Sequence, residues 1–155
     1  MANGEALGPL MARYNVVLAE QAVPEWHAAL DALLELDGVA GPVGYWGISM
    51  GGGIGVPLVA AEPRITAAVL GLAGHKTLLE AAGRISVPVE FLLQWDDEVI
   101  PRDEGLALFD TFASREKTLH ANLGGHVGVP AFELESSARF FTRHLAPGHP
   151  RGAAG

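Results

Sequence analysis

The sequence predicts an α/β fold, in which a mostly parallel β-sheet is flanked by helices. Apolar segments of strand length alternate four times with segments of helical spacing, and this alternation is typical of parallel sheets whose strands are joined by helices. Several strand segments are apolar throughout, as expected for strands that helices cover on both faces. The chain has 155 residues, of which 49% are hydrophobic. We therefore assign residues 1–146 to a single globular domain.

The predicted elements follow one another in a regular order. The first helix spans residues 23–36, where four apolar side chains recur at helical spacing: Trp26, Leu30, Leu33 and Leu34. The remaining helices are expected at residues 50–61, 76–83, 103–112 and 130–145, and the strands at residues 43–48, 65–72, 87–94 and 118–121. Pro57 is expected to kink the second helix. The segment YNVVL, residues 14–18, is a candidate for a further strand.

Composition and charge exclude several classes of function. The formal net charge of −8, with Lys and Arg scattered along the chain, argues against nucleic acid as a partner. The absence of cysteine excludes disulfides, thiolate metal sites and a Cys nucleophile. Glycines and prolines interrupt the uncharged stretch 38–61 too often for a membrane span. We expect no signal peptide, a cytoplasmic protein, and a flexible tail at residues 147–155.

Ser49 lies in the pentapeptide Gly-Ile-Ser-Met-Gly, residues 47–51, between a predicted strand and a predicted helix. A sharp turn there would raise the hydroxyl above the sheet, and glycines on both sides would avoid clashes in the folded-back chain. The Met50 amide, at the start of the helix, would face the oxygen that becomes negative during acyl transfer. A glycine-rich turn with an incidental serine would show the same sequence pattern. The strand before it and the helix after it favour a nucleophile.

Three acidic residues, Asp96, Asp97 and Glu98, directly follow the apolar strand 87–94. Functional groups gather at the carboxyl ends of parallel strands, and a carboxylate there can orient a histidine and stabilise its protonated form. Acidic residues would equally start a turn and cap the helix that begins at Asp103. Of the two aspartates we prefer Asp97 as the histidine partner.

His126 lies in the glycine-rich segment NLGGHVG, residues 122–128, after the fourth predicted strand. The glycines would let this loop carry an imidazole across to the serine. The chain order Ser49, Asp97, His126 favours His126 as the base. The sequence has no H-E-x-x-H motif and no paired histidines at ligand spacing, so we expect no metal site. The other histidines lie in predicted helices, a strand, a loop or the tail: His27, His75, His120, His144 and His149.

Together these segments resemble the α/β-hydrolase superfamily and, within it, the dienelactone hydrolase-like and small esterase branch. GISMGG (47–52) is similar to the family's nucleophile elbow, DEVIP (97–101) to its acid loop, and GGH (124–126) to its histidine loop. The register of DEVIP favours Asp97 over Asp96. The resemblance covers about residues 20–146. It implies a catalytic triad of Ser49, Asp97 and His126, with no cofactor.

The resemblance weakens before the elbow. Family members usually carry several strands and a His-Gly-type oxyanion loop there, whereas this sequence has only about 40 residues and no His-Gly pair. The resemblance therefore implies a reduced α/β-hydrolase fold that lacks the first three or four strands and leaves the second oxyanion donor unassigned. The strand 43–48 would have a bare edge. We expect a homo-oligomer, a missing N-terminal portion, or the segment 14–18 to cover it.

The function expected from these features is that of a serine carboxylesterase. His126 would accept the Ser49 proton, Ser49 would attack the ester carbonyl, and water would later release the acyl group. Small acyl esters or lactones are the expected substrates, because no lid-like insertion is visible between residues 72 and 87. The alternative is a noncatalytic α/β-hydrolase-like remnant or subunit with an incomplete oxyanion hole.

Overall fold

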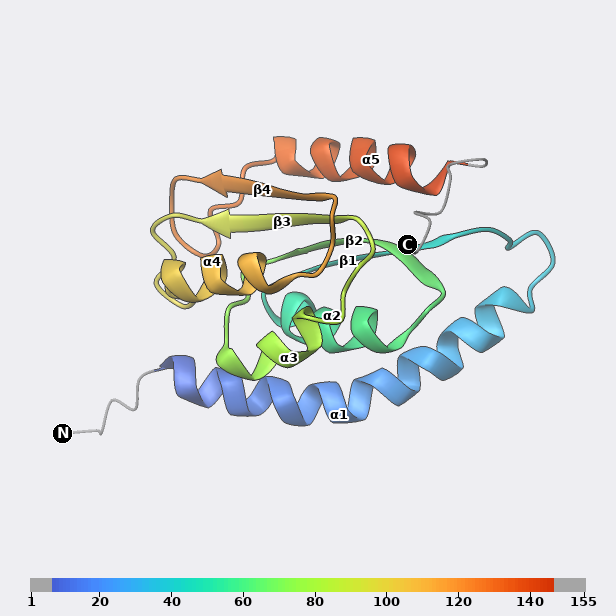
Figure 1. The fold of residues 1–155 in the computed structure, drawn as a ribbon, viewed down its shortest axis with the longest axis horizontal. Helices are drawn as coiled ribbons and strands as arrows, with labels where there is room; N and C mark the ends of the chain where they lie inside the picture. Colours follow the sequence, from blue (N-terminus) through green and yellow to red (C-terminus); the bar gives the residue numbers. More distant parts are fainter. Residues whose placement is uncertain (1–6, 147–155) are drawn as a thin grey trace.

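The computed structural model describes residues 7–146, in which four strands form one parallel sheet with the order β1-β2-β3-β4 (Figure 1). The strands lie close to the predicted positions: β1 (Val43–Ile48), β2 (Ile65–Gly71), β3 (Val89–Gln94) and β4 (Lys117–Asn122). The predicted fold class is thereby confirmed. The predicted tail, residues 147–155, lies outside the described residues.

Helices cover both faces of the sheet. Figure 1 shows α5 (Phe132–Leu145) on one face, and α2 (Met50–Ala61), α3 (Leu79–Ala82) and α4 (Arg102–Thr111) on the other. A short 3₁₀ helix, η1 (Lys76–Leu78), leads directly into α3, so the helix predicted at 76–83 is divided in two. Outside α2 runs α1 (Leu7–Leu34), which packs against it. Among the described residues, no helix combines the length and the hydropathy that crossing a membrane requires.

The N-terminal helix corrects two predictions. It begins at Leu7 rather than at residue 23, and the candidate strand 14–18 is wrong because this segment is helical. Pro24 lies inside the helix and does not end it. The less exposed side chains Val16, Ala19 and Val23 are three and four residues apart, and this helical period continues to the buried Leu30. Burial of that stripe outweighs the strand propensity of the two valines in YNVVL.

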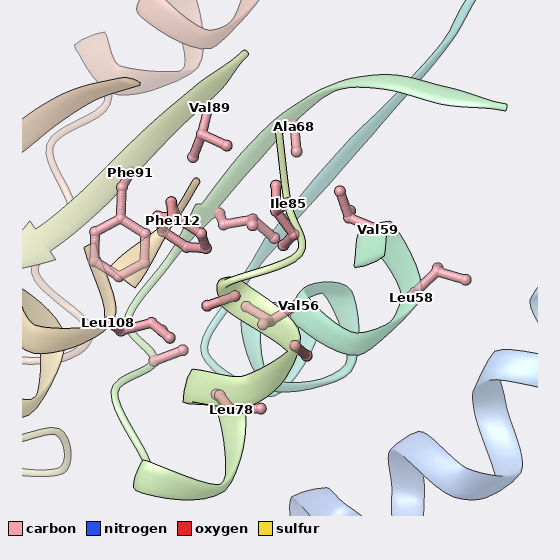
Figure 2. Close-up of a cluster of buried hydrophobic side chains, with 14 of the residues drawn as sticks. Val56, Leu58, Val59, Ala68, Leu78, Ile85, Val89, Phe91, Leu108 and Phe112 are labelled. Atoms are coloured by element: carbon pink, nitrogen blue, oxygen red, sulfur yellow. The ribbon is translucent and has the colours of Figure 1, made fainter. Parts of the chain in front are cut away.

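The main core lies between the sheet and helices α2, α3 and α4. Figure 2 shows buried side chains of this core, with Phe91 of β3 beside Phe112. The ring centroids of these two residues lie 5.7 Å apart. A smaller apolar cluster joins the opposite face to α5 through Val69, Leu92 and Phe140. Full burial of each such side chain contributes roughly 1.5–3 kcal/mol. The core therefore fixes the strand ends from which the candidate site residues extend.

β1 forms an edge of the sheet. Within residues 7–146 it pairs only with β2. Trp46, in the middle of the strand, keeps 44% of its surface exposed. The segment 14–18 does not cover this edge because it belongs to α1.

Candidate active site

Ser49 occupies a strained turn between β1 and α2. Its backbone angles, φ 55° and ψ −117°, are unusual for a residue with a side chain. The turn is held on both sides: the Ser49 N–H donates to the Gly71 carbonyl at 3.0 Å, and the Gly53 N–H donates to the Ser49 carbonyl at 2.9 Å. Ser49 thus has the conformation that the pentapeptide predicts.

The glycines around Ser49 play unequal parts. A Cβ atom at Gly47 would lie 2.6 Å from the Gly51 carbonyl oxygen, and one at Gly52 would lie 2.4 Å from the Gly71 carbonyl oxygen. Real side chains do not approach backbone so closely, so both positions require glycine. A Cβ atom at Gly51 would meet nothing nearer than the Tyr45 hydroxyl, at 4.0 Å. The expectation of a steric need on both sides of Ser49 therefore holds for Gly47 but not for Gly51.

Ser49, His126 and Asp97 form one continuous hydrogen-bonded chain. The Ser49 Oγ lies 2.7 Å from His126 Nε2. On the other side of the ring, His126 Nδ1 lies 2.8 Å from Asp97 Oδ2 and 3.0 Å from Oδ1. The three residues follow β1, β4 and β3 at the carboxyl ends of these strands. The structure therefore brings together the three residues that the sequence selects.

The two adjacent aspartates make different contacts. Asp97 is nearly buried, with 2% of its side chain exposed, and its Oδ1 also accepts the backbone N–H groups of Val99 and Ile100. Asp96 points elsewhere and accepts the Gly124 N–H at 3.3 Å. Asp97 is therefore the carboxylate that contacts the imidazole.

Two further side chains position the loop that carries His126. Glu98 Oε2 accepts the His126 backbone N–H at 3.0 Å, and this hydrogen bond lowers the pKa of Glu98. Gln94, at the buried end of β3, donates from Nε2 to the Gly125 carbonyl at 3.1 Å. Gln94 could have been identified from the sequence as a site residue, because it is a polar residue at the end of a largely apolar strand segment. Glu98 could not have been identified in this way, because it contacts His126 across two loops that are distant in the sequence.

Tyr45 contacts the backbone of the turn that carries Ser49. Its hydroxyl donates to the Gly51 carbonyl at 2.7 Å. Burial raises the pKa of Tyr45 to about 12, so the hydroxyl stays protonated and remains a donor at neutral pH. Sequence reasoning did not identify Tyr45, because it reads as one more apolar residue of the strand.

Four other histidines lie among the described residues. His27 pairs with Glu62 at 2.7 Å, and His120 with Glu133 at the same distance. His75 is buried, and burial lowers its pKa. His144 lies 3.6 Å from a Glu116 carboxylate oxygen, and His149 lies outside the described residues.

This geometry is suited to proton transfer from a hydroxyl. With a proton on Nδ1 facing Asp97, the Nε2 of His126 is free to accept the Ser49 proton. His126 has 13% of its side chain exposed, so the imidazole is partly shielded from solvent. The Met50 N–H stands at the start of α2, where the helix dipole favours negative charge.

Comparisons with known proteins agree with the fold. The chain is similar to a zinc-bound structure of a cold-adapted esterase from an Arctic intertidal metagenomic library, with 36% identity and a TM-score of 0.78 over 83% of this chain and 60% of that one. An acetyl xylan esterase from Paenibacillus sp. R4 matches 81% of this chain and 52% of its own, at 18% identity and TM-score 0.70. An esterase of Pyrococcus furiosus matches 83% of this chain and 64% of its own, at 14% identity and TM-score 0.68.

The chain thus spans between 52% and 64% of the length of these three esterases. No protein-family model and no curated protein matches the sequence. The parallel sheet, the strained serine turn after β1 and the likeness to esterases agree with one another. On this basis the chain has an α/β-hydrolase-like fold and is similar to esterases that share this fold.

Proposed function

We propose that the protein is a serine hydrolase that cleaves small carboxylic esters or lactones, with Ser49, His126 and Asp97 as its catalytic triad. The observation that carries the proposal is the unbroken chain of hydrogen bonds from the Ser49 hydroxyl through His126 to Asp97. The esterase activity of the structural neighbours supports it. The dienelactone hydrolase-like branch stays a prediction from the three motifs.

In the proposed reaction, His126 Nε2 accepts the Ser49 proton while Oγ forms a bond to the ester carbonyl carbon. The Met50 N–H stabilises the oxyanion of the tetrahedral intermediate. As that intermediate collapses, the bond to the alcohol oxygen breaks and His126 returns the proton to the leaving alcohol. Water then attacks the acyl-serine, gives its proton to His126, and the carboxylic acid departs as Ser49 regains its hydrogen.

A cavity next to the strand that leads into Ser49 supports the choice of small substrates. It has a volume of about 170 Å³ and lies on the α5 face of the sheet, bordered by the apolar Trp46, Ile48, Leu92 and Val129 and by the polar Glu133 and Ser137. Ile48 precedes the nucleophile, and Val129 follows the His126 loop. An apolar cavity of about 150 Å³ holds a benzene-sized group. A short acyl chain or a small ring fits this volume, whereas a long lipid chain does not.

A fluorophosphonate probe and a short-chain p-nitrophenyl ester test the proposal together. The probe should label Ser49, as identified by peptide mass spectrometry, and Ser49→Ala should abolish both labelling and turnover. Ser86→Ala is the matched control, because Ser86 is an exposed serine in a loop away from the triad. Hydrolysis that survives in Ser49→Ala would contradict the proposal. Labelling of Ser49 without ester turnover would favour the noncatalytic alternative, in which the oxyanion hole is incomplete.

A further inference from the structure

A second cluster of ionisable side chains lies on the α5 face of the sheet. Glu90 from β3, His120 from β4 and Glu133 from α5 each offer one ligand atom, and these atoms all lie within 4.8 Å of one another. Glu133 Oε2 is 2.7 Å from His120 Nδ1, and Glu90 Oε2 is 3.7 Å from His120 Nε2. None of these three residues belongs to the proposed triad.

Neighbouring polar side chains orient both carboxylates. Asn122 Nδ2 donates to Glu133 Oε1 at 2.8 Å, which leaves Oε2 facing His120. Ser137 Oγ donates to Glu90 Oε1 at 3.0 Å, and Ser136 Oγ lies 3.4 Å from Glu90 Oε2. Metal-binding carboxylates are commonly held in this way by an outer layer of hydrogen bonds. The cluster is therefore preorganised.

With both carboxylates ionised, the charges in the cluster do not balance. Glu90 and Glu133 keep only 4% and 3% of their surface exposed. Within residues 7–146, both carboxylates have the same side chain as ion-pair partner, His120. Even a protonated His120 would leave one buried negative charge unmatched, and burying an unpaired carboxylate is costly. A divalent cation bound beside a neutral imidazole would balance both carboxylates.

We propose that Glu90, His120 and Glu133 bind one divalent transition-metal cation of the Zn²⁺ type. One imidazole nitrogen and two carboxylate oxygens form a donor set that suits such an ion. Glu133 also borders the cavity of about 170 Å³, so water can complete the coordination from that side. His120 coordinates as the neutral ring, and binding releases any proton on the coordinating nitrogen.

The bound cation would clamp the loop that carries His126. His120 lies in β4 and Glu133 in α5, and the loop between these elements contains His126. A cation held by both residues would tie the two ends of that loop to each other, and Glu90 would tie them to β3. The site is therefore structural, and it is separate from the proton transfer at Ser49.

Zn²⁺ titration of the tag-free, chelator-treated full chain tests the proposal. Calorimetry should show one Zn²⁺ per chain, and Tm should rise by roughly 5–10 °C at a Zn²⁺ concentration about 100-fold above Kd. His120→Gln and Glu133→Gln should each lose both effects. His27→Gln is the matched control, because His27 also pairs with a buried glutamate, Glu62, yet lies in no such cluster. Neither measurement depends on ester hydrolysis.

The NMR signals of the histidine rings give a second measurement on the unmutated chain. This measurement tests the proposed metal site even if a variant does not fold. Zn²⁺ should shift the His120 ring signals and leave those of His27 in place. A chain that takes up no Zn²⁺, or a His120→Gln variant that binds Zn²⁺ as tightly as the parent, would overturn the proposal. Shifts confined to histidines other than His120 would overturn it as well.

Discussion

Glu98 accepts the backbone N–H of His126 at 3.0 Å, while its neighbour Asp97 contacts the imidazole of the same residue at 2.8 Å. Two consecutive acids thus hold one histidine in two ways. One fixes where the loop lies, and the other fixes how the ring is oriented. This division leads to two separate predictions for the acid loop.

Replacing Asp97 should be far more damaging than replacing Asp96. Asp97→Asn should lower kcat by about 10⁴-fold, because the amide would favour the wrong imidazole tautomer. Asp96→Asn should change kcat by less than about tenfold, since the Asp96 carboxylate accepts the backbone N–H of Gly124 and it is Asp97 that accepts from the imidazole. Steady-state kinetics on a p-nitrophenyl ester measures both. If Asp96→Asn were the slower enzyme, the assignment of the acid would be wrong.

Glu98 should act as a positioning residue. Glu98→Ala removes the acceptor for the His126 N–H and should lower kcat by about tenfold with little change in KM, in line with the loss of one hydrogen bond. Glu98→Gln keeps an acceptor oxygen and should restore most of the rate. Glu80→Ala, at an exposed glutamate of α3, controls for loss of surface charge. Equal losses of kcat in the alanine and glutamine variants would argue against this role.

Activity should rise from acidic to neutral pH through a single ionisation. Only neutral His126 can accept the Ser49 proton, so protonation of the ring stops the reaction. The pH profile of kcat/KM measures this ionisation in the free enzyme. His126→Gln should lose the ionisation together with the activity. A profile that stays flat across this range would show that His126 is not the base.

Glu62 should couple the stability of the fold to acid. Hydrogen bonds from Arg64 lower the pKa of Glu62 from 4.5 to about 2. Because the folded-state pKa lies below the unfolded value, the stabilisation is complete above about pH 4.5 and is lost as the pH falls towards 2. A shift of this size corresponds to a free energy on the order of 3 kcal/mol.

Urea unfolding at several pH values tests this coupling. Glu62→Gln should unfold more easily at pH 7, and its stability should fall less than that of the parent below pH 4.5. Glu80→Gln is the control, since its ion pair with Arg84 lies at the surface and should contribute little. If both variants kept the acid dependence of the parent, the stabilisation would not reside in Glu62.

We propose that the free edge of β1 is covered by a second copy of the chain in solution. β1 is uncharged, and Trp46 in this strand keeps 44% of its surface exposed. Light scattering after size exclusion should give a mass above that of one chain, and Trp46→Lys should shift it towards the monomer. A soluble, fully active monomer of the parent would contradict this prediction and show that the edge of β1 needs no second chain.

The strands and the site loops were predictable because their signals are local. β1 and β2 are short, largely apolar runs, and Ser49 follows β1 directly, while Asp97 and His126 lie in the loops that follow β3 and β4. The prediction missed the first part of α1 because the valines of YNVVL, residues 14–18, favour a strand, whereas in the structure the helix runs from Leu7 through Pro24. The cluster of Glu90, His120 and Glu133 has no sequence signature. Its members come from three elements, and only the register of β3 against β4, together with the position of α5, brings them together.

The position of β1 at the edge of the sheet has a consequence for the cavity. The hydrogen-bonded chain from Ser49 to Asp97 is built entirely from segments that follow β1, β3 and β4, so no part of it crosses that edge. Trp46 and Ile48, which border the cavity, belong to the edge strand itself. Whatever pairs with β1 therefore bears on the cavity and not on the contacts among Ser49, His126 and Asp97. A change of that partner is expected to alter which groups enter the cavity while these contacts stay in place.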